Sequence, residues 1–114
     1  MKLRRGHLYV VDFNPRVRTK PGKVRPVVVV QDDLVNEAGY PSTIVLPTTT
    51  RLADTDTPLR LRITSGTAGL DRDSDVLVAQ VIAVANESFR KELGVLPAIL
   101  LETLDRKLRT VIGL

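Results

Sequence analysis

The sequence contains no cysteine, no tryptophan and a single histidine, His7. Without thiols the chain forms neither disulfides nor thiolate metal sites, which agrees with a reducing compartment. A metal site needs several convergent ligands, and a Ser-His-Asp triad would need His7 beside a serine, which nothing in the sequence indicates. We therefore expect no metal and no other cofactor. We interpret His7 as a strand-edge or surface residue.

Phosphate-binding glycine loops and long apolar stretches are also missing. Asp71, Asp73 and Asp75 resemble the first positions of a calcium loop, but Val76 replaces the required glycine and Ile82 the closing glutamate. No apolar run approaches the roughly 18 residues of a membrane span, and the basic start does not lead into a signal-peptide core. We expect a soluble cytoplasmic protein that binds no membrane.

Positive charge is concentrated at one end of the chain. The 114 residues predict one domain over 1–114. Residues 1–25 hold eight of the 17 Lys and Arg but one of the 13 Asp and Glu, a formal charge of +7 in a chain of net +4. Clustered positive charge attracts polyanions and makes binding salt-dependent. A solvated basic face without a ligand is the alternative.

The segment around Arg25 is the most informative stretch. Four consecutive valines, Val27 to Val30, follow Pro26 and predict a strand buried on both faces. Pro26 locks its own φ and biases Arg25 towards an extended conformation. A guanidinium held on a stiff strand end suits a phosphate, whereas pairing with a carboxylate is the alternative.

The rest of the pattern predicts a mainly β fold with one C-terminal helix. We expect a basic loop over 14–22, a short helical turn over 33–36 and a helix that begins at Pro97 and buries Leu101, Leu104, Leu108 and Val111. We expect further strands over 7–13, 43–46 (stopping at Pro47), 59–63, 76–84 and 90–96. This arrangement indicates a small antiparallel, barrel-like sheet.

Three hydroxyls, Thr48, Thr49 and Thr50, follow the predicted strand end at Pro47, and Gln80 interrupts the longest β-like run. Together with Arg25 and the basic loop, such groups support phosphodiester chemistry without metal when the 2′-hydroxyl of RNA is the nucleophile. Proton transfer is harder to assign, because an arginine stays protonated near neutrality and is a poor base.

Five blocks in this order resemble the MazF/PemK toxins, over nearly the whole chain. The blocks are residues 5–15 (RGHLYVVDFNP), 24–29 (VRPVVV), 45–49 (VLPTT), 69–74 (GLDRDS) and Gln80. The resemblance implies a homodimer with an SH3-like barrel that acts as a metal-independent, sequence-specific endoribonuclease on single-stranded RNA. Cleavage in that family leaves a 2′,3′-cyclic phosphate and a 5′-hydroxyl. A cognate antitoxin blocks the groove.

Site residues follow from the resemblance by position. Arg25 matches the catalytic arginine, Thr49 matches the catalytic threonine that follows Pro-x, and Thr19 and Gln80 fall where the family contacts RNA. A turn hydroxyl bonded to backbone is the alternative for Thr49, and a buried amide bridging strands is the alternative for Gln80. We add to the RNA-binding residues the basic loop and a neighbouring hydroxyl: Arg16, Arg18, Lys20, Lys23 and Thr48.

The chain departs from the family at four positions. Members commonly carry an aspartate at the position of His7, a glutamate at Lys20, an acidic residue at Ala79 and a basic residue at Ile82. Lys20 removes a carboxylate that has been proposed as proton acceptor, so proton transfer falls to Arg25 or to water. A groove for a phosphate chain also suits an acidic disordered segment, the expected part of the antitoxin.

Two other functions fit parts of the pattern. A CcdB-like topoisomerase poison shares this barrel, but that family ends in a tryptophan-containing tail, which is missing here. A non-catalytic nucleic-acid-binding barrel would use the basic loop, with only Tyr9, Phe13, Tyr40 and Phe89 available to stack on bases.

Overall fold

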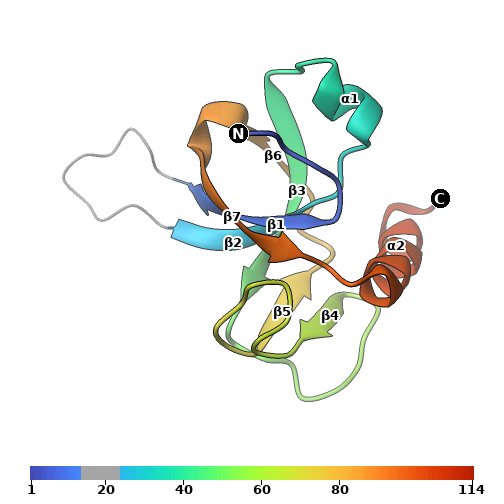
Figure 1. The fold of residues 1–114 in the computed structure, drawn as a ribbon. Coiled ribbons are helices and arrows are strands. Elements are labelled where there is room, and N and C mark those ends of the chain that lie inside the picture. The colour runs from blue at the N-terminus through green and yellow to red at the C-terminus, as the bar shows by residue number, and fades with distance from the viewer. Residues whose placement is uncertain (14–23) are drawn as a thin grey trace.

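The computed structural model describes residues 1–13 and 24–114. Within these ranges the chain forms a largely β structure with a helix at its C-terminal end (Figure 1). The strands are β1 (His7–Asp12), β2 (Val24–Val29), β3 (Ser42–Thr49), β4 (Arg60–Ile63), β5 (Ser74–Leu77), β6 (Ile82–Ala85) and β7 (Phe89–Val95). The helices are α1 (Asp33–Glu37), the 3-10 turn η1 (Asn86–Ser88) and α2 (Ala98–Ile112).

The seven strands of the described residues form one antiparallel sheet. Their order is β4-β5-β3-β2-β1-β7, and β6 pairs with β3. The end strands β4 and β7 do not pair with each other along this path, so hydrogen bonds do not close the sheet into a complete barrel. The predicted mainly β fold with a C-terminal helix is confirmed, and the term barrel describes it approximately.

Strand β2 lies between β1 and β3 and is the centre of the sheet. Its apolar side chains alternate between two cores, as a period of two requires. Val28 belongs to the first core, whereas Val27 and Val29 belong to the second, and all three are fully buried. The predicted strand buried on both faces is therefore confirmed.

The first core lies beneath α2. Leu104 is fully buried in it, and Leu101, Leu108 and Val111 pack against it, so the predicted apolar face of the helix is confirmed. Pro97 precedes the helix as its N-cap. The second core, on the other side of β2, contains Tyr9, Val11, Val27, Val29, Val45, Val84 and Phe89. No helix in residues 1–13 or 24–114 is long and apolar enough to span a bilayer.

Two strand predictions are wrong in extent. β3 does not stop at Pro47 but continues to Thr49. Pro47 lies between the part of β3 that pairs with β6 and the part that pairs with β5, where its missing N–H interrupts neither ladder. The run 76–84 is two strands, because β5 and β6 pair with different halves of β3 and the chain must turn between them. That turn contains Gln80, whose N–H donates to the Leu77 carbonyl at 3.1 Å.

Candidate active site

Arg25 is the second residue of β2 and is exposed, although the strand beyond it is buried. It lies opposite Val11 of β1, on the same face of the sheet as Val27 and Val29. Within the described residues its guanidinium has no hydrogen bond and no ion pair. The alternative of a carboxylate partner is therefore not realised in the described part of the chain. The five donors of the guanidinium are available to an external anion.

Two hollows meet at Arg25. The first, of about 290 Å³, is mostly polar and is lined by Val24, Arg25, Pro26, Thr48, Thr49, Thr50, Arg51 and Ser74. The second, of about 270 Å³, is mostly apolar and is lined by Phe13, Arg25, Pro47, Gln80 and Ile82. We call them the polar hollow and the apolar hollow. Arg25 is common to both, so a bound chain that crosses from one to the other passes over its guanidinium.

Thr49 lies at the end of β3 and faces the same site. Val27 pairs with Pro47, and continuing this antiparallel register by two residues sets Arg25 opposite Thr49. Directly opposite residues project to the same face of a sheet. The Thr49 hydroxyl accepts a hydrogen bond from the Arg51 N–H at 3.1 Å. The alternative role considered for Thr49, a turn hydroxyl bonded to backbone, therefore accounts for this one bond. The hydroxyl's own proton remains available for donation.

Thr48 is placed differently from Thr49. Its side chain is 3% exposed, and its hydroxyl donates to the Pro26 carbonyl at 2.9 Å. This bond ties β3 to β2 one residue after Arg25. The geometry favours a role for Thr48 in fixing that backbone over the predicted direct contact with RNA.

Gln80 is exposed in the turn after β5, and its amide has no hydrogen-bond partner in the described part of the chain. A buried amide that bridges strands is therefore not found at Gln80. Gln31 has that role instead: its amide group binds the Asn36 side chain, the Ser42 carbonyl and the Ile44 N–H. The Gln80 amide carries both donors and acceptors, as recognition of a base edge requires.

The other predicted RNA-binding residues lie outside the described residues. They are Arg16, Arg18, Thr19, Lys20 and Lys23. In the sequence they precede Arg25 directly, so their contribution remains a prediction.

A buried carboxylate, Asp75, is the cross-strand neighbour of Thr49, and the sequence drew attention to it only as part of the rejected calcium-loop pattern. It is 1% exposed and accepts hydrogen bonds from Arg62 Nε at 2.6 Å, the Ala53 N–H at 2.8 Å and Arg60 Nη1 at 3.2 Å. Burial opposes ionisation and is the largest influence on the pKa of Asp75, but these three donors together outweigh it and hold that pKa below its usual value. The alternation of Arg60 and Arg62 along β4 is the one sequence signal for this cluster.

Two further residues of the site were not among the predicted site residues, although Phe13 was named as a ring that could stack on bases. Phe13 has the pattern of a core residue, yet it is only partly buried and forms a wall of the apolar hollow. Arg51 is exposed in the polar hollow and has no side-chain partner within the described residues. The sequence pattern that could have identified Arg51 as a site residue is a cation directly after three threonines.

The remaining aromatic residues lie elsewhere. Tyr9 is fully buried, where its hydroxyl accepts from the Arg4 N–H at 2.9 Å and donates to the Lys2 carbonyl at 3.1 Å. Burial raises the pKa of Tyr9 to about 12. Phe89 packs edge-on against Tyr9. Neither ring is available for stacking, so Phe13 is the aromatic residue that lines the site.

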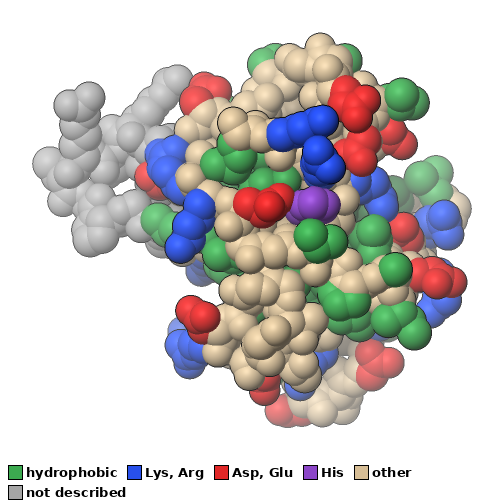
Figure 2. Space-filling view, viewed as in Figure 1, with side chains coloured by type: hydrophobic (Ala, Val, Ile, Leu, Met, Phe, Trp, Pro, Cys, Tyr) green, Lys and Arg blue, Asp and Glu red, His purple; other side chains and the backbone are tan. Residues whose placement is uncertain are grey.

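His7 is a partly exposed residue of β1, as predicted, and its Nδ1 lies 2.7 Å from Glu92 Oε1. The hydrogen bond with His7 lowers the pKa of Glu92. Figure 2 shows the histidine beside an acidic side chain, on a face where cations and anions are interspersed. This face therefore lacks the uniform positive charge expected of a polyanion path.

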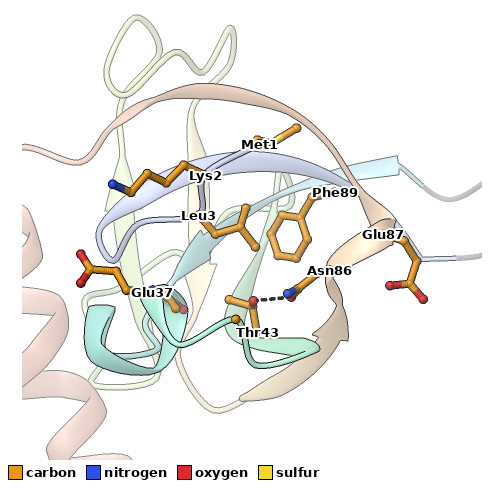
Figure 3. Close-up of a pocket in the computed structure, with 10 residues that line it drawn as sticks. Met1, Lys2, Leu3, Glu37, Thr43, Asn86, Glu87 and Phe89 are labelled. Carbon is orange, nitrogen blue, oxygen red and sulfur yellow. Dashed lines mark hydrogen bonds between the residues drawn. The ribbon is translucent and has the colours of Figure 1, made fainter.

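A larger hollow, of about 860 Å³, lies among the N-terminal segment, the end of α1 and η1. Leu3 and Phe89 project into it, and a hydrogen bond of 2.7 Å joins Thr43 and Asn86 at its base (Figure 3). Glu37 and Glu87 belong to its lining. Size alone does not make it the candidate site, because its carboxylates offset the charge of Lys2 in the same lining, whereas the smaller hollows share Arg25 and have no carboxylate in their described lining.

Fold and site together define a small antiparallel β protein in which Arg25 of the central strand β2 and Thr49 of the neighbouring strand β3 line one polar hollow. Residues 4–112 match the family of PemK-like, MazF-like toxins of type II toxin-antitoxin systems, and the chain belongs to this family. The resemblance seen in the sequence is thereby confirmed.

Individual relatives cover the chain almost completely. The chain is 31% identical over 114 residues to endoribonuclease MazF6 of Mycobacterium tuberculosis, covering 100% of both proteins. It is 28% identical to endoribonuclease EndoA of Bacillus subtilis, covering 100% of this chain and 97% of the relative. The solved structure of a mycobacterial endoribonuclease in complex with its cognate antitoxin has a TM-score of 0.77 at 15% identity, over 96% of this chain and 94% of that chain, and supports the fold.

Proposed function

We propose that the chain, acting as one domain over 1–114, is a sequence-specific, metal-independent endoribonuclease that cleaves single-stranded RNA such as mRNA. It is the toxin of a toxin–antitoxin pair and works in the cytoplasm, where mRNA is found. The observation that carries this proposal is the position of Arg25: exposed, without a protein partner in the described residues, in the same polar hollow as Thr49 and shared by two hollows. Its relatives named as endoribonucleases support it.

The reaction we propose is an internal transphosphorylation. The 2′-oxygen attacks the adjacent phosphorus, the bond from phosphorus to the 5′-oxygen breaks, and the products are a 2′,3′-cyclic phosphate and a 5′-hydroxyl. Arg25 stabilises the charge that develops on the phosphoryl oxygens, and the Thr49 hydroxyl donates a hydrogen bond to them. Both groups are held on paired strands, so little reorganisation is needed.

Protons must leave the 2′-hydroxyl and reach the 5′-oxygen. In the described part of the chain neither hollow is lined by a carboxylate or an imidazole. We therefore assign both transfers to water, with Arg25 orienting the phosphate.

Base recognition belongs to the apolar hollow in this proposal. Phe13, Pro47 and Ile82 offer apolar surface to a base, and the Gln80 amide offers donors and acceptors to its edge. Such contacts need an unpaired base, which is why the proposed substrate is single-stranded. The basic residues that precede Arg25 in the sequence would extend the path for the phosphates.

Two protein partners complete the proposal. We expect a homodimer, and an antitoxin with an acidic disordered segment that covers Arg25. The structural relative solved with its cognate antitoxin supports this second partner.

The decisive experiment is incubation of the purified protein with a long single-stranded RNA in EDTA, followed by mapping of cut positions and end chemistry. We expect discrete cuts with 2′,3′-cyclic phosphate ends. Arg25→Ala should abolish cutting, and Arg25→Lys should restore little of it, because a point charge does not reproduce the planar fork. Arg106→Ala is the control: it removes an exposed cation from α2, which lies across the molecule from the start of β2 (Figure 1).

Full activity of Arg25→Ala would refute the assigned chemistry. No cutting by the folded wild-type dimer would favour the topoisomerase-poison or simple binding function. Cutting that stops in EDTA would contradict metal independence.

A further inference from the structure

The segment that follows β3 is held by the buried carboxylate of Asp75 and the more exposed side chains of Arg60 and Arg62. Each arginine bridges Asp75 and a backbone carbonyl of this segment. Arg60 Nη1 donates to the Arg51 carbonyl at 2.7 Å as well as to Asp75, and Arg62 Nη2 donates to the Ala53 carbonyl at 2.7 Å. The Ala53 N–H donates directly to Asp75 at 2.8 Å. Three bonds therefore fix residues 51–53 onto β4 and β5.

The same segment carries the bond that holds Thr49. Arg51 donates its N–H to the Thr49 hydroxyl, while its carbonyl is held by Arg60. Asp75 is also the direct cross-strand neighbour of Thr49 on one side and of Arg62 on the other. A continuous path of short contacts thus leads from Asp75 through Arg60 and Arg51 to the proposed catalytic hydroxyl.

A second anchor restrains the far end of this segment. Lys107 of α2 donates to the Thr57 carbonyl at 2.9 Å and to Asp56 at 3.2 Å. Residues 51–53, next to the site, depend on the Asp75 cluster, whereas residues 56–57 are tied to the helix. The two anchors can therefore be tested separately.

We propose that Asp75 is a positioning residue, which acts through Arg60 and Arg51 to hold the Thr49 hydroxyl in its reactive place beside Arg25. This inference rests on the proposed ribonuclease activity. Asp75 also pairs with Arg60 and Arg62, which line a separate hollow, so in this proposal RNA phosphates meet Arg25 and Arg51 rather than those two arginines. The cluster sets both the geometry of the site and the path of the phosphate chain.

Two variants with opposite charge changes distinguish the positioning of the Thr49 hydroxyl from an effect of net charge on RNA binding. Asp75→Asn removes one negative charge and places an amide NH₂ against donors of the cluster. Arg60→Met removes one positive charge and the bond to the Arg51 carbonyl, but leaves the Asp75–Arg62 pair in place. We expect kcat to fall about tenfold in both, because both release Arg51. KM should fall in Asp75→Asn and rise in Arg60→Met, because affinity for a polyanion follows charge.

Asp105→Asn is the matched control. Asp105 on α2 pairs with Arg5 through two hydrogen bonds of 2.7 and 3.2 Å. Asp105→Asn therefore makes the same charge change as Asp75→Asn and breaks an Asp–Arg pair that lies away from the polar and apolar hollows. Its kcat should equal that of the wild type. Opposite changes of kcat in Asp75→Asn and Arg60→Met would reduce the cluster to an electrostatic role and overturn the proposal.

Amide hydrogen exchange supplies a readout that does not depend on cleavage. The Arg51 and Ala53 amides should exchange faster in Asp75→Asn, and the Arg51 amide faster in Arg60→Met, with Asp105→Asn unchanged. Wild-type exchange rates at these amides would overturn the proposal, as would faster exchange with unchanged kcat. If Asp75→Asn does not fold, Arg60→Met decides. A wild-type protein that cuts no RNA would refute the proposed function, while exchange would still report whether Asp75 holds the segment.

Discussion

Thr48 and Thr49 are neighbours in sequence, yet their hydroxyls have different surroundings. The Thr48 hydroxyl is buried against the Pro26 carbonyl, whereas the Thr49 hydroxyl opens on the polar hollow. Alternation along a strand produces this difference, since successive side chains point to opposite faces.

Replacing each hydroxyl by a methyl group tests the distinction. Thr48→Val should lower the free energy of unfolding by about 1 kcal/mol, because a buried hydrogen bond is lost, and keep most cleavage activity at temperatures where it is folded. Thr49→Val should leave the stability nearly unchanged and reduce kcat roughly 100-fold, the usual effect of one lost transition-state donor. Urea unfolding and cleavage kinetics on both variants give the comparison. A larger loss of kcat in Thr48→Val and a larger loss of stability in Thr49→Val would mean that Thr48 is the catalytic threonine and Thr49 the structural one.

Single residues could be predicted from the sequence to different degrees. Arg25 was accessible because a proline and a valine run, both local signals, define its strand. Asp75 was not, because its partners Arg60 and Arg62 come together with it only once β4 pairs with β5. Gln80 was placed inside a strand because an apolar run of this length does not reveal a turn.

At the scale of elements, the loop before β5 packs unusually closely on β7. Gly69 has φ +77°, and a Cβ added there would overlap the Leu93 carbonyl; Gly94 faces the backbone of Ala68 in the same way. Ala68 itself has a positive φ of 55°. The two backbones touch here without intervening side chains.

Gly69→Ala should therefore be more destabilising than a glycine substitution in open space. Gly39 is the control, because it has φ +76° but nothing within 4 Å of an added Cβ. Both variants carry the left-handed backbone strain of about 1–2 kcal/mol, so their difference isolates the overlap, which we expect to cost a further 1–3 kcal/mol or so. Chemical unfolding measures both. Equal stabilities would mean that β7 shifts without cost.

Elements were predicted best where one pattern covers their length. The terminal helix and the strands over residues 7–13 and 90–96 follow from periodicity and proline positions. The extension of β3 past Pro47 and the division of 76–84 depend on which strands β3 pairs with, and a linear pattern does not contain that information.

For the whole molecule, charge asymmetry is the dominant feature. Residues 1–25 carry +7, and the remaining chain is acidic overall. The face seen in Figure 2 is mixed in sign, so the asymmetry along the sequence does not make that face uniformly basic.

Binding of single-stranded nucleic acid should therefore depend steeply on salt. A DNA oligonucleotide is a suitable probe, because it lacks the 2′-hydroxyl and is not cleaved by the proposed reaction. Raising NaCl from about 50 to about 200 mM should weaken binding at least roughly tenfold, as expected for about three phosphate contacts. Arg25→Ala should reduce the slope of log affinity against log salt by about 0.7. A slope near zero in fluorescence anisotropy would contradict an electrostatic path, and an acidic antitoxin should show the same salt trend.

The burial of β2 from both faces has an evolutionary consequence. The strand that presents Arg25 is held between two cores. Phe13, Gln80 and Ile82, which line the apolar hollow, belong to other parts of the chain. Gln80 is exposed, so substitutions there can accumulate at little cost to folding and without moving the guanidinium, whereas Phe13 and Ile82 also pack against the second core. Under the proposed function, descendants of one such protein can thus diverge in the RNA sequences they cut while keeping one cleavage mechanism.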